Sequence, residues 1–258
     1  MILDLFAGPG GWSEGLSSLG LTEIGIEWDS AACRTAKAAG HLRIQADVAT
    51  YPTEPFVGKV TGLIASPPCQ AWSMAGNRKG ELDRINCHTL ADAMAAGADS
   101  IDVQWEDGRS SLVCQPIRWV RDIKPEWVAL EQVPPVVGLW EHFARIFNSW
   151  GYNAWAGVLN AANYGVPQTR QRAFLLASLT RKVAPPAPTH CKGGSESDLF
   201  GSSLEPWVSM ASALGWGMTD RPGLSITHAG QDGGSGARAS IERERERKLA
   251  SGCTGDAA

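Results

Sequence analysis

The sequence predicts an α/β fold built on an open and largely parallel sheet. Over the first 178 residues, short apolar runs alternate with segments of helical spacing, which is the order expected of parallel strands joined by crossover helices. Several of these runs end in glycine or proline turns. A chain of 258 residues with 43% hydrophobic content is also long enough to bury a substantial core.

The first half of this alternation contains four expected strands, one of them weak: 2–6, 24–27, a run closed by Asp47, and 61–66. Helices are expected at 12–19 and 29–39. The second of these is rich in alanine and opens with Asp29 or Ser30 as its N-cap.

The same alternation continues in the second half. Segments with helical spacing lie at 111–123 and 143–150, and a strand is expected at 127–131. The segments 153–159 and 172–178 are expected to form a final pair of strands.

Two stretches break the pattern. Residues 76–110 are polar and rich in glycine and aspartate, which predicts a long loop of the kind that often serves as a functional lid. From Ala184 onward the pattern fades into a proline-rich linker, a glycine-rich stretch and a segment of alternating charge, at 185–188, 230–236 and 242–248. We therefore expect one folded domain over 1–183, followed by an irregular region over 184–258.

Composition excludes several classes of protein. None of the six cysteines forms a C-x-x-C pair, so we expect no zinc knuckle and no metal site. No apolar run approaches the roughly 20 residues needed to cross a bilayer. Residues 1–4 carry no basic leader region, which predicts a cytoplasmic protein with free thiols. The net charge of −4 is not a nucleic-acid footprint, although a basic groove can lie on an acidic protein.

The first motif is the glycine turn at residues 4–11, directly after the first strand. Glycines there let the backbone approach a ligand, and the helix that follows offers free N–H groups. Alone, such a turn is equally well explained as a tight connection without a ligand. Glu27, at the end of the second strand, favours a nucleoside cofactor because its carboxylate can accept both ribose hydroxyls. The spacing is not that of a dinucleotide site, and no Walker sequence is present.

The second motif, residues 66–70, follows a strand at the edge where ligands of open α/β sheets gather. Its two prolines stiffen the loop that presents Cys69, a candidate nucleophile if its thiolate is stabilised. The alternative is a buried structural thiol, the commonest fate of a free cysteine. A zinc deaminase is excluded, because position 72 is a tryptophan and no histidine begins an H-x-E sequence.

The third motif is residues 131–134, at the end of the expected strand 127–131. A carboxyl group at this place, beside the Cys69 loop of a doubly wound sheet, can hold a proton on a ring nitrogen. An exposed glutamate that caps a strand is the alternative interpretation of Glu131.

The fourth motif, residues 168–172, runs into the last expected strand. Alternate residues of an extended chain point to the same face. Arg170 and Arg172 can therefore grip a phosphate or the anionic edge of a base together. The alternative is a strand start with two solvated arginines.

These four motifs, in this order, resemble those of the C5-cytosine DNA methyltransferases over residues 1–180. The glycine turn matches the cofactor motif of that family, and the matches that follow it along the chain are residues 27–28, 47–48, 67–70, 131–133 and 168–172. One departure lies within a motif: Gln132 stands where the family has asparagine.

The resemblance implies a Rossmann-like class I S-adenosylmethionine-dependent methyltransferase sheet with helices on both faces. S-adenosyl-L-methionine would lie over the glycine turn, with Phe6 and Trp28 against the adenine. Glu27 would hold the ribose, and Asp47 the adenine amino group. The remaining cofactor-binding residues implied by the match are Asp4, Ala7, Gly8, Gly10, Gly11, Val48 and Pro68.

The resemblance also implies the reaction, which is methylation of cytosine at C5 in double-stranded DNA. The target base would be flipped out of the duplex, and Cys69 would attack C6. Glu131 would stabilise the protonated N3, while Arg170 and Arg172 would hold the base. Three basic residues within 76–110 would contact phosphates as the loop closes: Arg78, Lys79 and Arg84.

The C-terminal part departs from the family. Family members continue into a target-recognition domain and end with motifs that complete the cofactor pocket, and neither closing motif is found here. Residues 184–258 are therefore expected to be a partial or truncated target-recognition region with a flexible tail. Besides DNA, the expected partner is a complementing chain that supplies the missing motifs.

Other functions stay open. The chain can be a catalytically incompetent remnant that binds DNA or a partner, or an RNA cytosine-5 methyltransferase. A small-molecule methyltransferase is disfavoured, because the Pro-Pro-Cys-Gln sequence with paired arginines suits chemistry on a base.

Overall fold

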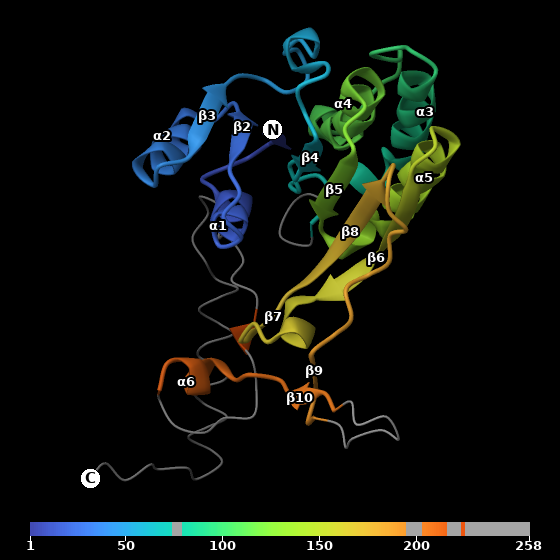
Figure 1. Cartoon of the computed structure of the whole chain (residues 1–258). Helices are drawn as coiled ribbons and strands as arrows, with labels where there is room; N and C mark the ends of the chain where they lie inside the picture. The colour runs from blue at the N-terminus through green and yellow to red at the C-terminus, as the bar shows by residue number, and fades with distance from the viewer. Residues whose placement is uncertain (74–78, 195–202, 216–222, 225–258) are drawn as a thin grey trace, which may run out of the picture.

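A computed structural model describes residues 1–73, 79–194, 203–215 and 223–224. Its centre is a seven-stranded sheet in the order β3-β2-β1-β4-β5-β8-β6 (Figure 1). The strands are β1 (Ile2–Leu5), β2 (Glu23–Glu27), β3 (Leu42–Gln45), β4 (Gly62–Ala65), β5 (Trp127–Gln132), β6 (Asn153–Asn160) and β8 (Gln171–Ser178).

The direction of the strands confirms the predicted fold class. β3, β2, β1, β4 and β5 are parallel to one another. β8 runs antiparallel between β5 and β6, with Gln132 opposite Ala173 on one side and Leu159 opposite Arg172 on the other. The carboxyl ends of the parallel strands therefore meet the beginning of β8 at one edge of the sheet.

Helices cover the two faces of the sheet unequally. The helices are α1 (Gly11–Ser17), α2 (Ser30–Ala38), α3 (Arg84–Ala95), α4 (Gln115–Ile123), α5 (Val137–Ser149) and α6 (Met210–Ala213). α3, α4 and α5 gather beside β5, β8 and β6, whereas α1 and α2 lie with β1, β2 and β3 (Figure 1).

Two hydrophobic clusters reflect this difference. The larger one joins Leu130 and Leu175 of the sheet to fully buried aromatic residues of α4 and α5, among them Trp119 and Phe143. The smaller cluster consists of Ile2, Leu16, Ile64 and Ala129. Because alternate residues of a strand point to opposite faces, Ala129 belongs to the face opposite that of Leu130.

The α2 helix begins as the sequence predicted. Asp29 is its N-cap, and its carboxylate accepts hydrogen bonds from the amides of Ala31 and Ala32 at 3.1 and 3.2 Å. This cap fixes where the chain turns after β2 and so places the residues at the end of that strand.

The segment 76–110 corrects a prediction, because it is not one long loop. It contains α3 and the 3-10 turns η2 (Lys79–Glu81) and the start of η3 (Gly108–Cys114). The apolar residues of α3 recur at helical spacing and are buried, namely Cys87, Leu90, Ala91 and Met94. The polar residues between these positions concealed this face in the sequence.

Three other boundaries differ from expectation. The third strand ends at Gln45, and Asp47 lies in the following turn, where its carboxylate accepts the amide of Ala49 at 2.9 Å. The predicted helix 111–123 begins as the 3-10 turn η3 before α4 starts. α5 starts at Val137, earlier than the predicted 143.

The described part of the C-terminal region attaches to the catalytic part through η5 (Ala161–Tyr164). Thr189 donates its amide to the carbonyl of Asn163 at 2.9 Å, and Trp207 donates its indole N–H to the Asn163 side chain at 3.0 Å. The short strands here are β7 (Gln168–Thr169), β9 (His190–Cys191), β10 (Glu205–Pro206) and β11 (Gly223–Leu224). The stretches 230–236 and 242–248 lie outside the described residues, and a domain boundary after residue 183 stays a prediction.

No helix within the described ranges is long and apolar enough to span a membrane. In the same ranges, no group of three or more histidine, cysteine or acidic residues is arranged to hold a metal ion.

Candidate active site

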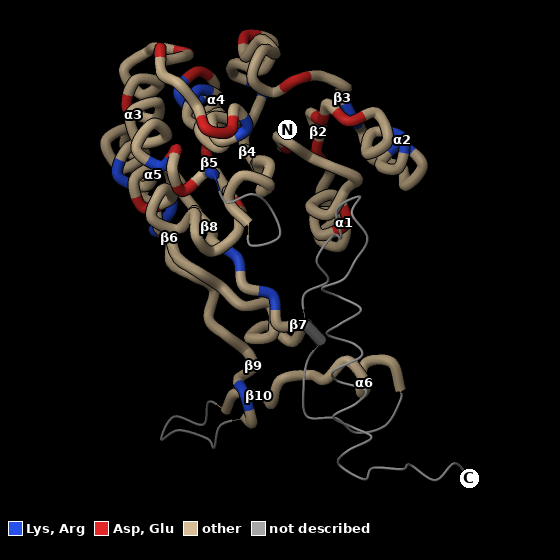
Figure 2. The backbone as a smooth tube through the Cα atoms, turned by 180° about the vertical axis from the view of Figure 1, so that it is seen from behind, with Lys and Arg blue, Asp and Glu red and all other residues tan. Residues whose placement is uncertain are grey.

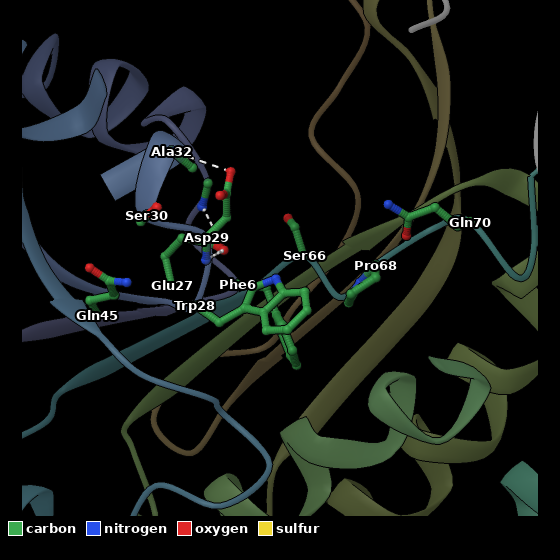
Figure 3. A pocket seen from close by; sticks show the side chains of 11 residues that line it. Phe6, Glu27, Trp28, Asp29, Ser30, Ala32, Gln45, Ser66, Pro68 and Gln70 are labelled. Atoms are coloured by element: carbon green, nitrogen blue, oxygen red, sulfur yellow. Dashed lines mark hydrogen bonds between the residues drawn. The ribbon is translucent and has the colours of Figure 1, made fainter. Parts of the chain in front are cut away.

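A pocket of about 620 Å³ lies at the carboxyl edge of the sheet, over the ends of β1, β2, β3 and β4 (Figure 3). Its lining residues are Phe6, Gly8, Glu27, Trp28, Asp29, Ser30, Ala32, Gln45, Ser66, Pro68 and Gln70. Five of them were predicted as cofactor-binding residues from the sequence: Phe6, Gly8, Glu27, Trp28 and Pro68.

Glu27 joins the glycine turn to the start of α2. Its carboxylate accepts the amide of Gly8 at 2.9 Å through Oε2 and the amide of Asp29 at 2.8 Å through Oε1. The residue is only 8% exposed. Each carboxylate oxygen has a further lone pair, so the carboxylate can still accept hydroxyl groups from a ligand in the pocket.

Two aromatic side chains line the pocket, Phe6 and Trp28, both labelled in Figure 3. Trp28 is 75% exposed. Phe6 has a φ of +59°, a left-handed conformation that is rare for a residue with a side chain and that gathers at functional sites. The pair offers flat apolar surfaces that suit an adenine ring.

Four other predicted residues lie beneath the turn and do not line the pocket. Asp4 is completely buried in β1, and within the described structure its carboxylate has no hydrogen-bond partner. Burial raises its pKa well above the ordinary range, although Arg43 opposes this. Ala7 donates its amide to the Ile26 carbonyl at 3.1 Å, and Gly10 and Gly11 cap and begin α1.

Asp47 and Val48 also lie away from the pocket lining. Asp47 is exposed in the turn after β3. Val48 is 2% exposed, and its carbonyl accepts hydrogen bonds from Arg118 and Trp119. Their assignment to the adenine stays a prediction.

Several lining residues were not predicted as site residues, namely Asp29, Ser30, Ala32, Gln45, Ser66 and Gln70. Gln45 ends β3, and ligands gather at the carboxyl ends of parallel strands, so its position in the strand pattern was an available signal. Ser66 and Gln70 lie within the motif that was recognised around Cys69.

The loop that carries Cys69 is fixed by Gln132. The Gln132 side chain is 2% exposed, donates to the Pro67 carbonyl at 2.7 Å and accepts the Val133 amide at 2.6 Å. Gln132 thus connects the end of β5 to the loop after β4, while Cys69 itself is exposed. The glutamine that replaces the family's asparagine has a definite role in the architecture.

Glu131 lies between two arginines. Its Oε1 is 3.0 Å from Nε of Arg172 and 3.8 Å from a terminal nitrogen of Arg170. Burial raises the pKa of Glu131, and this effect outweighs the two arginines and a hydrogen bond with Ser66, which act in the opposite direction. The carboxyl group therefore holds a proton to a higher pH than an ordinary glutamate.

Arg172 completes a group of four predicted catalytic residues. Burial and the charge of Arg170 lower its pKa, while Glu131 and Cys69 act to raise it, so the Cys69 sulfur lies within electrostatic reach of the guanidinium. Figure 2 shows basic residues on the chain where β7 leads into β8. The fold brings together Cys69, Glu131, Arg170 and Arg172 from separate segments of the sequence.

The basic residues expected on the loop are in part engaged elsewhere. Arg84 forms an ion pair with Glu81 at 2.8 Å, donates to the Pro135 carbonyl and lies over the Trp72 ring. The amine of Lys79 is 3.5 Å from the Glu106 carbonyl, and Arg78 lies outside the described residues. Contacts of these side chains with phosphates stay a prediction.

This sheet order, with one antiparallel strand inserted beside β5 and a pocket over β1 and β2, defines a class I S-adenosylmethionine-dependent methyltransferase. The sequence profile of the C-5 cytosine-specific DNA methylases matches residues 1–94 and 100–196. The chain belongs to this family, and S-adenosyl-L-methionine is its cofactor.

Individual relatives differ in how much of their length the chain covers. It is 27% identical to the Type II methyltransferase M.AquIA of Picosynechococcus, over 83% of this chain and 87% of that protein. It is 30% identical to M.DdeI of Desulfomicrobium norvegicum, over 68% of this chain but 40% of the relative. The S. pombe Dnmt2 methyltransferase shares the fold with a TM-score of 0.50 and 18% identity, over 71% of this chain and 50% of that one.

Proposed function

We propose that the chain is a DNA (cytosine-5-)-methyltransferase that transfers the methyl group of S-adenosyl-L-methionine to C5 of cytosine in double-stranded DNA. The observation that carries the proposal is the convergence of Cys69, Glu131 and Arg172 at one edge of the sheet. This edge also holds the pocket that contains Glu27.

The residues of the pocket fit the cofactor. Its volume of about 620 Å³ lies within the range of about 300–1,000 Å³ that is usual for small-molecule sites. Glu27 binds the ribose hydroxyls, and Phe6 and Trp28 pack against the adenine. Pro68 lies in the loop that carries Cys69 and also lines this pocket, so the cofactor site and the nucleophile share one loop.

The catalytic residues make C5 of cytosine reactive enough to accept a methyl group. C5 of cytosine is a poor nucleophile until C6 is saturated, so a covalent nucleophile and a proton on the ring are both needed. The Cys69 thiolate adds to C6 of the flipped base, and Glu131 keeps a proton on N3. The electron pair that becomes available at C5 takes the methyl group, and S-adenosylhomocysteine is the leaving group. A base such as water then removes the C5 proton, which expels the Cys69 thiolate, and the N3 proton returns to Glu131 as the ring is restored.

The electrostatics of the site support these roles. Burial raises the pKa of Glu131, which favours the protonated carboxyl group that N3 requires. Arg172 and Arg170 hold Glu131 in place and offer donors to the base. The names of the relatives suggest that the reaction is the modification step of a restriction-modification system.

We also propose that a second polypeptide covers the open side of the cofactor pocket. Trp28 lines the pocket and is 75% exposed. Apolar surfaces of this kind suit a protein partner.

The test uses duplexes that carry 5-fluorocytosine in many sequence contexts, with S-adenosyl-L-methionine. Fluorine cannot leave C5 as a proton does, so a working enzyme is trapped as a covalent adduct. We expect an adduct that requires the cofactor and is lost in Cys69→Ala. If adducts form only with RNA of the matching sequence, the substrate of the chain is RNA and not DNA. If a folded chain binds the cofactor but forms no adduct, the chain is inactive without a complementing polypeptide.

A further inference from the structure

A buried polar cluster lies under the glycine turn, on the side away from the pocket. Its centre is Arg43 on β3, whose side chain is 3% exposed, as is that of its ion-pair partner Glu23 on β2. None of the sequence motifs includes either residue. Burying a guanidinium is costly unless each of its donors finds an acceptor.

The contacts of Arg43 satisfy four of its five N–H donors. Nη1 lies 3.1 Å from Glu23 and 2.8 Å from the Leu42 carbonyl, and Nη2 donates to the Ser13 hydroxyl at 2.8 Å. The Ser13 hydroxyl in turn donates to Glu23 at 2.5 Å. The fourth donor, Nε, is directed to the Gly8 carbonyl at 3.2 Å. A guanidinium that is held by Glu23, Leu42 and Ser13 thus also reaches the glycine turn.

A glycine leaves the space for this side chain. Gly25 lies opposite Arg43 in the strand register, and a Cβ at Gly25 would come within 2.7 Å of Nη1 and 2.9 Å of Cδ. The arginine can cross β2 because Gly25 has no side chain.

Gly8 is consequently held from both sides. Its amide donates to Glu27 at 2.9 Å, and its carbonyl accepts from Arg43 at 3.2 Å. The amide and the carbonyl belong to different peptide planes, so fixing both limits rotation about φ and ψ of Gly8. This matters because Gly8 has a φ of +54° and lines the pocket, and glycine is the most mobile residue when it is not held.

We infer that Arg43 is a positioning residue for the cofactor: it holds the Gly8 carbonyl so that the glycine turn and Glu27 are in their binding geometry before the ligand arrives. This inference rests on the proposed function, since the ligand is S-adenosyl-L-methionine. A turn that is ordered in advance loses less entropy on binding, and affinity rises accordingly. Arg43 acts through Gly8, and it lies on the opposite side of the turn from the pocket.

The competing explanation is that Arg43 only holds β2 and β3 together through Glu23. Two variants separate the explanations. Arg43→Lys keeps the charge near Glu23 but cannot also reach Ser13 and Gly8 with a fork of donors. Glu23→Gln removes the ion pair but keeps an oxygen that accepts from Ser13 and Arg43, so the bond to Gly8 persists. Arg145→Lys, at an exposed site on α5, is the control.

The measurements are the dissociation constants of S-adenosyl-L-methionine and S-adenosylhomocysteine by calorimetry, KM and kcat for methyl transfer, and the melting temperature without ligand. For Arg43→Lys we expect binding of both ligands to weaken about tenfold, the loss of roughly one hydrogen bond to a charged group. KM for the cofactor should rise in proportion, while kcat at saturation changes less than about twofold. Glu23→Gln should lower the melting temperature and leave both dissociation constants within about threefold of the wild type.

Two outcomes would overturn the inference: Arg43→Lys binding the cofactor as the wild type does, or Glu23→Gln losing as much affinity as Arg43→Lys. If Arg43→Lys does not fold, hydrogen exchange of the wild-type Gly8 amide decides, because a turn ordered in advance is protected without ligand and a disordered one is not. A wild-type chain that binds neither ligand contradicts the proposed function itself, and is thereby distinguished from a failure confined to Arg43.

Discussion

The two halves of the carboxyl edge of the sheet are held together by different means. The cofactor half is built from β1, β2 and β3, and its key contacts join Gly8 to Glu27 and to Arg43. The catalytic half brings Cys69 and Glu131 to Arg172 from β4, β5 and β8, which are far apart in the sequence. In the first half charged side chains hold the backbone of the glycine turn, whereas in the second half charged side chains pair with one another.

This difference teaches that binding and chemistry should be separable by mutation. A change in the cofactor half should weaken the ligand and spare the chemical step at saturation. A change in the catalytic half should slow the chemical step and leave cofactor binding unchanged. The four predictions that follow run from the largest expected effect to the smallest.

Glu131→Gln should break the catalytic half alone. The amide cannot hold an ionisable proton for N3, so kcat should fall about 10²–10⁴-fold, while cofactor binding measured by calorimetry stays unchanged. Because the pKa of Glu131 is raised by burial, the wild type should lose kcat as the pH rises through that pKa. The variant should lack this limb of the profile.

The matched control for both glutamate variants is Glu141, which is exposed on α5. Glu141→Gln should leave kcat and its pH profile as in the wild type. A Glu131→Gln enzyme with normal kcat would remove this residue from the proton chemistry.

Glu27→Ala should break the cofactor half alone. It removes the acceptor of the ribose hydroxyls and of the Gly8 amide, so the cofactor should bind more weakly by about 1.5–3 kcal/mol. Titration calorimetry measures this loss, and adduct formation with 5-fluorocytosine should recover at high cofactor concentration. If Glu141→Ala loses as much cofactor affinity as Glu27→Ala, or if Glu27→Ala loses none, the ribose does not bind at Glu27.

Gln132→Leu tests the connection between the nucleophile loop and β5. It leaves the Pro67 carbonyl and the Val133 amide without their partner, which should cost about 1–3 kcal/mol in the free energy of unfolding measured with urea. Gln132→Asn, the residue of the family motif, is shorter by one methylene group and should lose part of this stability. A Leu variant as stable as the wild type would show that the loop is held by other contacts.

Asp4→Asn tests the buried acid beneath the turn. The folded-state pKa of Asp4 is raised, so its contribution to stability is present below the ordinary aspartate pKa and is lost as pH rises through the folded value. The urea midpoint of the variant should therefore rise relative to that of the wild type as the pH increases from the ordinary aspartate pKa toward the folded value. Asp102→Asn, at an exposed position, should show no such trend.

Much of this architecture was predictable from local patterns. The strands that end in motifs were located because each motif follows an apolar run, and Asp29 was one of the two residues predicted as the N-cap of α2. α3 was missed although Cys87, Leu90, Ala91 and Met94 recur at helical spacing, because the polar residues around them dominated the interpretation of the segment. The prediction that was wrong concerns a helix whose stability comes from tertiary packing.

The site was less predictable than the fold. A matched motif transfers residue types, but it does not tell which residues of a strand face the ligand. Asp4 and Val48, for example, are buried and do not line the pocket. The roles of Gln132 and Arg43 depend on the strand pairing, which the sequence pattern alone does not specify.

The position of β8 has a consequence for synthesis of the protein. The strand is inserted between β5 and β6, although it follows both in the chain. A nascent chain therefore exposes the whole cofactor half, and even Cys69, before Arg172 leaves the ribosome. At about 5–20 residues per second, the wait between Cys69 and Arg172 is about 5–20 s. Until then the emerging nucleophile lacks its guanidinium partner, so competence for methyl transfer arises late in translation.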